Sequence, residues 1–116
     1  MVDLRPRKPV AWLGDSREAA RDFPNDAKYV LGAELDLIQL GLNPTNWKPI
    51  KTVGAGVSEI RVVMDNQYRV LYVAKFKEAI YVLHAFAKKT QKTSAVDLAL
   101  ATRRYRDLLN MRRDNV

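Results

Sequence analysis

The chain has 116 residues, of which 47% are apolar, so it has the length of one ordinary domain and enough apolar residues to build its own core. With no cysteine and one histidine, it excludes a thiol nucleophile, an iron–sulfur cluster and a disulfide scaffold, and it argues against a zinc hydrolase. No apolar run reaches the roughly 18 residues of a membrane span, and the N-terminal residues lack the pattern of a signal peptide. We therefore expect a single cytoplasmic domain over residues 1–116, with no metal, no cofactor and no membrane partner.

Positive charge is concentrated in the last third of the chain. Lys and Arg number 20 against 13 Asp and Glu, which gives a net charge of +7. Residues 1–74 carry ten basic and nine acidic side chains, whereas residues 75–116 carry ten basic and four acidic ones. A field of this kind attracts polyanions, of which nucleic acid is the commonest. The alternatives are an acidic partner protein or a basic face that only maintains solubility.

The first 42 residues predict a strand followed by two helices. The apolar run 10–13, followed by Gly14, predicts the strand. Capping-box spacing predicts a first helix over 17–22, which ends where Phe23 precedes a proline. A second helix from Pro24 to Gly41 is indicated by apolar residues at helical spacing, namely Ala27, Leu31, Leu35, Ile38 and Leu42.

The rest of the chain predicts a long loop, three strands and a helix. The loop covers residues 43–58, and the strands cover about 57–64, 68–74 and 79–86. The final helix is expected to be capped by Thr93 or Ser94 and to bury Leu98, Ala101, Tyr105 and Leu108. This order predicts an α+β domain with a mostly antiparallel sheet, on which two N-terminal helices and a C-terminal helix pack.

Two arginines on neighbouring strands are the first candidate site. If Val63 lies opposite Arg69 and residues 65–67 form the loop, Arg61 and Arg69 share a sheet face and neither is buried. Two guanidinium groups on one face repel each other unless an anion lies between them, so they are candidate phosphate ligands. The alternative is a salt bridge of Arg61 or Arg69 with Glu59.

A basic segment follows the last strand. The residues LHAFAKKTQKT at 83–93 place three lysines and two threonines directly before a helix N-terminus, where they can contact phosphate oxygens. The alternative is a solvated basic connector. His84 shares the sequence parity of Ile80 and Val82, which favours a core histidine bonded to backbone over a catalytic acid.

Four segments carry a family resemblance that covers about residues 8–104. They are WKPIK at 47–51, GAGVSEIR at 54–61, YRVLY at 68–72 and LHAFAKKTQKT at 83–93. Together they resemble the phage-derived, HigB-like toxins of the RelE/ParE superfamily. The resemblance implies the RelE/ParE-like α+β fold, which agrees with the element order predicted above.

The resemblance implies a toxin of a type II toxin–antitoxin pair that cuts mRNA on the ribosome. It implies a helix-turn-helix antitoxin as partner, with operator DNA bound only through the toxin–antitoxin complex. Transferred to matching positions, it gives Arg61, Arg69, Lys88 and Lys92 as catalytic residues and Lys48, Lys51, Lys89 and Arg103 as RNA-binding residues. In these roles the arginines stabilise the phosphorane, Lys88 or Lys92 is the acid, and Lys51 is the base or an RNA contact. The alternatives are a ParE-like gyrase poison and a non-catalytic relative that only binds nucleic acid or antitoxin.

Overall fold

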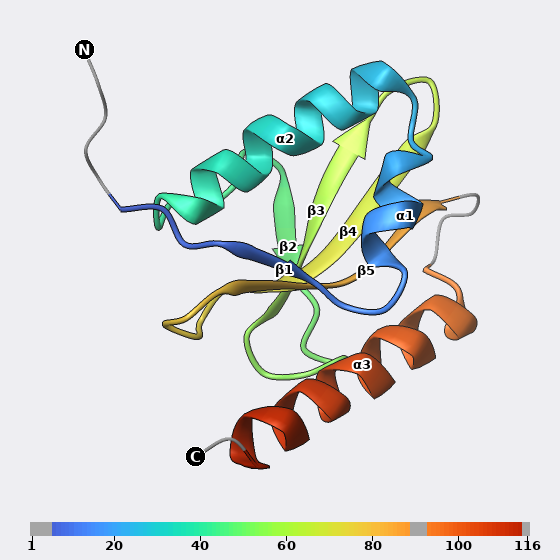
Figure 1. Cartoon of the computed structure of the whole chain (residues 1–116). Helices are drawn as coiled ribbons and strands as arrows, with labels where there is room; N and C mark the ends of the chain where they lie inside the picture. Colours follow the sequence, from blue (N-terminus) through green and yellow to red (C-terminus); the bar gives the residue numbers. More distant parts are fainter. Residues whose placement is uncertain (1–5, 89–92, 115–116) are drawn as a thin grey trace.

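A computed structural model describes residues 6–88 and 93–114 of the chain. Within these residues the fold is mixed α+β, with one five-stranded sheet and three helices (Figure 1). The elements are β1 (Val10–Trp12), α1 (Ser16–Arg21), α2 (Asn25–Gln39), β2 (Trp47–Pro49), β3 (Val57–Val63), β4 (Gln67–Val73), β5 (Ile80–Lys88) and α3 (Ala95–Asp114). The predicted order of elements is confirmed with one addition: β2 lies inside the segment that was predicted to be a loop.

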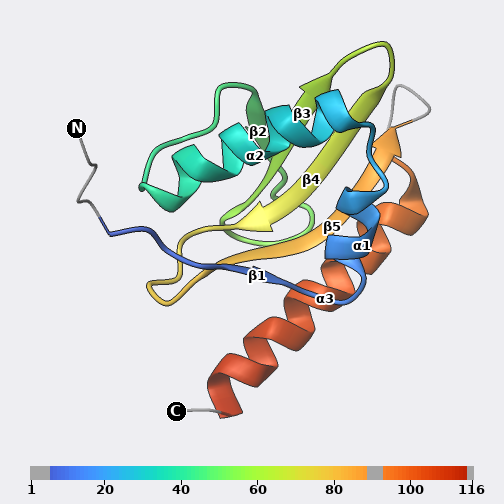
Figure 2. The same cartoon turned by 45° about the horizontal axis from the view of Figure 1, so that its top comes forward.

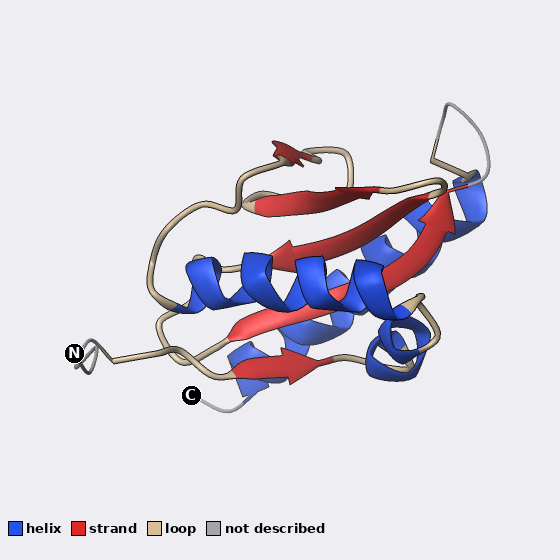
Figure 3. Ribbon diagram, turned by 90° about the horizontal axis from the view of Figure 1, so that it is seen from above, coloured by secondary structure: helices blue, strands red, loops and turns tan. Residues whose placement is uncertain are grey.

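The strands are arranged in the order β1-β5-β4-β3-β2. β1 runs parallel to β5 and the other three pairs are antiparallel, which confirms a mostly antiparallel sheet. Helices α1 and α2 lie on one face of this sheet and α3 lies on the other (Figures 1 and 2). Seen from above, α2 lies over the strands and α3 lies behind them (Figure 3). The sheet therefore has helices on both faces. None of the helices in the described part of the chain is long and apolar enough to cross a membrane.

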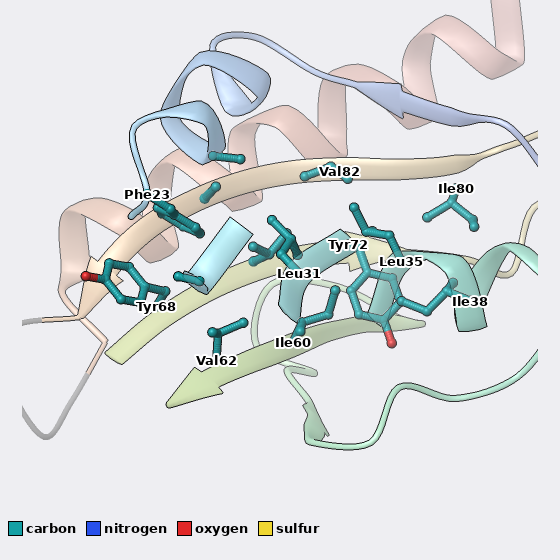
Figure 4. Close-up of a cluster of buried hydrophobic side chains, with 14 residues drawn as sticks. Phe23, Leu31, Leu35, Ile38, Ile60, Val62, Tyr68, Tyr72, Ile80 and Val82 are labelled. Atoms are coloured by element: carbon teal, nitrogen blue, oxygen red, sulfur yellow. The ribbon is translucent and has the colours of Figure 1, made fainter. Parts of the chain in front are cut away.

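The face below α2 is a continuous apolar core (Figure 4). Helix α2 contributes the predicted stripe, and the strands contribute Ile60, Val62, Val70, Tyr72, Ile80 and Val82. Leu42 was predicted to extend the stripe, but it is exposed. The reason is the turn at Gly41, whose φ of 85° ends the helix and directs the chain away from the sheet.

The opposite face has an apolar core only near one end. There Leu71, Val73 and Leu83 pack against Ala101, Tyr105 and Leu108 of α3, which confirms these three residues of the predicted stripe. Leu98, predicted to be buried with them, is only partly buried because it lies beside a cleft. The sequence analysis expected neither arginine on this face to be buried. Helix α3 covers part of this face.

A β-bulge in β5 changes which face its side chains occupy. Leu71 pairs with His84, but the next residue, Tyr72, pairs with Val82, so Leu83 is the extra residue. The bulge moves His84 to the α3 side, whereas Val82 packs in the core below α2. The prediction that His84 shares a face with Ile80 and Val82 is therefore wrong, because strict alternation does not hold across a bulge.

Candidate anion-binding cleft

A cleft of about 570 Å³ opens on the α3 side of the sheet, beside the first turns of α3. Its walls come from β2 and the following loop, from β3, from the end of β5 and from the start of α3. The lining residues are Lys48, Pro49, Ile50, Lys51, Thr52, Glu59, Arg61, Lys88, Thr93 and Leu98. Four of these are cations and one is an acid, so the cleft is suited to bind an anion.

Arg61 and Arg69 lie directly opposite each other on β3 and β4. This confirms that both arginines are on one sheet face. The exact register differs from the prediction, because Val63 pairs with Gln67 and the connecting loop covers residues 64–66. The loop still has three residues, so the parity argument holds although the predicted pairing partner was off by two positions.

Arg69 is buried, contrary to the expectation that neither arginine would be. Its side chain is 5% exposed, against 30% for Arg61. Its guanidinium donates to the Gln67 Oε1 at 2.6 Å and to the Tyr68 carbonyl oxygen at 3.3 Å. Burial is the main cause that lowers the pKa of Arg69, with the positive charge of Arg61 adding to it and Glu59 opposing it.

Glu59 is the counter-ion of both arginines. Its Oε1 lies 3.3 Å from the Nε of Arg61 and 3.3 Å from the Nε of Arg69, and its side chain is 2% exposed. The salt bridge with Glu59, weighed above as the alternative to a phosphate site, is therefore present. It reduces the repulsion between the two guanidinium groups and leaves the three side chains with a net charge of +1.

The two arginines differ in what they can contact. Arg61 lines the cleft with a partly exposed side chain, whereas Arg69 is not among the lining residues. Arg61 can therefore reach a ligand directly. Arg69 contributes a fixed positive charge from below the surface, where the low dielectric strengthens its field.

Lys88 lines the cleft at the end of β5, two residues beyond Phe86, which pairs with Arg69. Desolvation by burial lowers the pKa of the Lys88 ammonium group, and the positive charges of Arg69, Arg61 and Lys48 lower it further, against the effect of Glu59. A lowered pKa makes proton donation easier near neutral pH.

Strand β2 forms a wall of the cleft that the sequence interpretation missed. It places Lys48 opposite Glu59, and Lys51 follows on the loop; both lysines are exposed at the cleft. Glu34 of α2 holds the start of this wall, because its buried carboxylate accepts hydrogen bonds from the Thr45 amide (2.9 Å), the Thr45 hydroxyl (2.8 Å) and the Asn46 amide (3.2 Å). The sequence signal for this contact is an acidic residue, Glu34, within the apolar stripe of α2.

His84 does not line the cleft, but it links β5 to the start of α3. Its Nε2 is 2.7 Å from the Asp97 Oδ1, so the expected bond to backbone is replaced by a carboxylate. Asp97 also accepts from the Ser94 hydroxyl, and its amide donates to that hydroxyl at 3.1 Å, which confirms Ser94 as the cap of α3. The pair joins the bulge of β5 to the first turn of the helix.

Three predicted site residues remain to be placed. Lys89 and Lys92 are outside the described residues. Arg103 is exposed on α3 and lines a different hollow, of about 350 Å³, together with Leu13 and Gly14. The structure thus brings together Lys48, Lys51, Arg61 and Lys88, with Arg69 beneath them, and leaves Arg103 apart.

A comparison with known families places this arrangement in context. No curated protein matches the chain. The model of the phage-derived Gp49-like proteins (DUF891) matches residues 18–106, a span that includes most of α1, all of α2, the cationic cleft and most of α3. The chain therefore belongs to the Gp49-like family of phage-derived proteins.

Proposed function

We propose that this protein is the toxin of a type II toxin–antitoxin pair, with a RelE/ParE-like fold and a HigB-like activity, and that it cleaves mRNA on the ribosome. The Gp49-like family is toxin-like and of the RelE/ParE type, which supports this class. The observation that carries the proposal is the cleft in which Arg61, Lys88, Lys48 and Lys51 surround a space large enough for a nucleotide.

The reaction proposed is attack of an RNA 2′-oxygen on the adjacent phosphorus. The O2′–P bond forms while the P–O5′ bond breaks, which leaves a 2′,3′-cyclic phosphate and a 5′-hydroxyl. Negative charge develops on the non-bridging oxygens during this step, so fixed cations nearby lower the barrier. Arg61 would contact these oxygens, and buried Arg69 would add its field.

Lys88 would protonate the leaving O5′. Among the lysines of the cleft it is the partly buried one with a lowered pKa, so its ammonium form gives up a proton more readily than an ordinary lysine. Lys48 and Lys51 are exposed at the rim. Lys48 would contact an RNA phosphate, and Lys51 would accept the proton of the attacking 2′-hydroxyl or contact a second phosphate. Lys89 and Lys92 keep their proposed roles as RNA contact and as alternative acid.

The partners proposed with this activity are the ribosome with its mRNA and a helix-turn-helix antitoxin, with operator DNA reached only through the complex. The sequence left two alternatives open. A gyrase poison would need no cluster of cations to bind a phosphate, and a relative that only binds nucleic acid or antitoxin would keep the cleft but would not cleave RNA.

The deciding experiment is expression of the chain with and without the neighbouring reading frame, followed by mapping of mRNA 5′ ends. We expect growth arrest, new 5′ ends within translated mRNA and rescue by the neighbouring product. Gyrase-dependent DNA breaks with intact mRNA would instead assign the ParE-like activity. Efficient cutting of naked RNA by the purified protein would contradict the dependence on the ribosome.

A further inference from the structure

A buried carboxylate in a cleft for anions needs an explanation, since it repels the ligand that the surrounding cations attract. Glu59 lines the cleft, and its side chain is 2% exposed. We propose that Glu59 is a specificity-determining residue, which accepts a hydrogen bond from a ligand hydroxyl beside the bound phosphate and so makes the cleft prefer ribonucleotide over deoxyribonucleotide chains. The inference rests on the proposed function for the identity of the ligand as a nucleic acid.

The two oxygens of this carboxylate are used very unequally. Oε1 is approached by both Arg61 Nε and Arg69 Nε at 3.3 Å, whereas the buried Oε2 has no hydrogen-bond partner among the described residues. A buried charged acceptor without a donor is costly, and native proteins rarely leave one unpaired. The Nε of Arg69 also lacks a hydrogen-bond partner, but it approaches Oε1 and does not supply Oε2. The missing element at Oε2 is thus a donor, and the cleft is the side from which a ligand can supply it.

A phosphate alone cannot be that donor. An ionised carboxylate only accepts hydrogen bonds, and a phosphodiester offers only acceptor oxygens, so the two groups repel each other. The ligand that fits both halves of the cleft has anionic oxygens for Arg61 and Lys88 and a hydroxyl donor close by. In a ribonucleotide chain the 2′-hydroxyl is bonded to the carbon next to the one that carries the 3′-phosphate, and it is the group by which proteins distinguish RNA from DNA.

The contacts around Glu59 also indicate how the ligand reaches it. Arg61 is 30% exposed, and its contact with Glu59 is long for a charged pair, so its guanidinium can turn toward a phosphate in the cleft. Arg69 is held by Gln67 and the Tyr68 carbonyl and stays in place as the remaining counter-ion. When Arg61 turns from the Glu59 carboxylate to a bound phosphate, the carboxylate becomes accessible to the hydroxyl beside that phosphate.

The test uses three labelled oligonucleotides of one sequence, with ribose, 2′-deoxyribose or 2′-O-methylribose, and measures binding by fluorescence anisotropy at low salt. The 2′-O-methyl probe keeps the oxygen but lacks the donor. We expect the wild-type protein to bind the ribose probe roughly tenfold to hundredfold more tightly than either other probe, the value of one hydrogen bond to a charged group. Gel analysis confirms that the ribose probe stays intact.

Glu59→Gln removes the negative charge with little change in shape, and Glu59→Met removes the acceptor altogether. Both variants are expected to lose most of the preference for ribose and to bind the deoxyribose probe more tightly than the wild-type protein does. Glu78→Gln is the matched control, because it makes the same change at a carboxylate that is paired with Arg112 outside the cleft, and it should keep the wild-type preference.

Three results would overturn the inference: no ribose preference in the wild-type protein, equal binding of the ribose and 2′-O-methyl probes, or an unchanged preference in either Glu59 variant that is folded by circular dichroism. An unchanged preference would make Glu59 a counter-ion alone. The 5′-end mapping judges the proposed function separately. Cleavage without a Glu59-dependent preference rejects only this inference, and a Glu59-dependent preference without cleavage rejects only the nuclease.

Discussion

The two faces of the sheet use their strand residues in different ways. Below α2, the side chains from β3, β4 and β5 are apolar and form one uninterrupted core. On the α3 side, the same strands are apolar beside Ala101 and Tyr105 but carry Glu59, Arg61 and Arg69 where they approach the cleft. One face therefore stabilises the fold along its whole length, whereas the other combines a smaller core with a charged site.

The comparison shows how a small domain can hold a charged site without losing its fold. The buried ions lie on the same strands as the apolar residues and are fixed by them, so the site has a rigid base. Charge inside the molecule is costly when it is unpaired, and the pairing of Arg69 with Glu59 reduces that cost. On this face we therefore expect some charged residues to stabilise the fold and others to serve the proposed activity.

The largest expected effect comes from Arg69→Ala, which removes a buried partner of Glu59. Breaking a buried ion pair typically costs ~3–5 kcal/mol, because it leaves the other charge uncompensated. Arg61 remains beside Glu59, so we expect a loss toward the lower end of this range. The sequence analysis expected Arg69 to be unburied, which would make this substitution nearly neutral for stability, but the burial of Arg69 overturns that expectation. Urea unfolding measures the change, and a loss below ~0.5 kcal/mol would show that the pair does not stabilise the fold.

A similar loss of stability is expected from Leu31→Ala in the core below α2. Leu31 is 4% exposed, and truncation of a buried leucine typically costs ~2–5 kcal/mol. The two losses should differ in their response to Glu59→Gln, which removes the charge left by Arg69→Ala but leaves the cavity of Leu31→Ala unchanged. Urea unfolding of the two double variants checks this. An identical response of both to Glu59→Gln would remove the distinction between the two faces.

Arg61→Ala should affect activity far more than stability. The side chain is partly exposed, so we expect a change in unfolding free energy of ~0.5 kcal/mol or less. The loss of one contact to the charge of the transition state costs about 100- to 1,000-fold in rate. The rate of mRNA cleavage in a reconstituted translation reaction measures the loss in rate, and urea unfolding measures the change in stability. Wild-type cleavage by the folded variant would mean that Arg61 does not contact the reacting phosphate.

These predictions depend on features that the sequence revealed only in part. The helical stripes and the parity of the hairpin gave the helices, the three long strands and the shared face of Arg61 and Arg69. Periodicity did not give β2, because three residues around a proline in a long loop carry no alternating pattern. The position of His84 depends on a bulge at Leu83, and the burial of Arg69 depends on the side chains that surround it in the folded sheet; neither follows from strict alternation.

The pH dependence of cleavage should report Lys88. As the acid, Lys88 must be protonated, and because its pKa is lowered the active form is lost at a lower pH than for an ordinary lysine. We therefore expect the cleavage rate to fall as the pH rises through this lowered pKa. In Lys88→Arg the residue stays protonated, so cleavage should be slower and no longer fall in that range. Lys28→Arg, on the exposed side of α2, is the control and should keep the wild-type profile. An unchanged profile in Lys88→Arg would assign the acid to another group.

The smallest effect is expected at Arg103, for which the sequence predicted a role in RNA binding. Leu98 of α3 lines the cleft, and Arg103 follows five residues later, which places it about 140° around the helix and about 7.5 Å along it. The side chain instead lines the hollow beside Leu13 and Gly14. The affinity for single-stranded RNA falls as salt rises. On a plot of the logarithm of the binding constant against the logarithm of the salt concentration, the slope should become smaller in magnitude by about 0.7 for each phosphate contact removed. We expect this decrease in Lys48→Ala and no decrease in Arg103→Ala, measured by anisotropy across a salt series. An equal decrease in both variants would extend the RNA path around α3, and the cationic surface would then not be confined to the cleft.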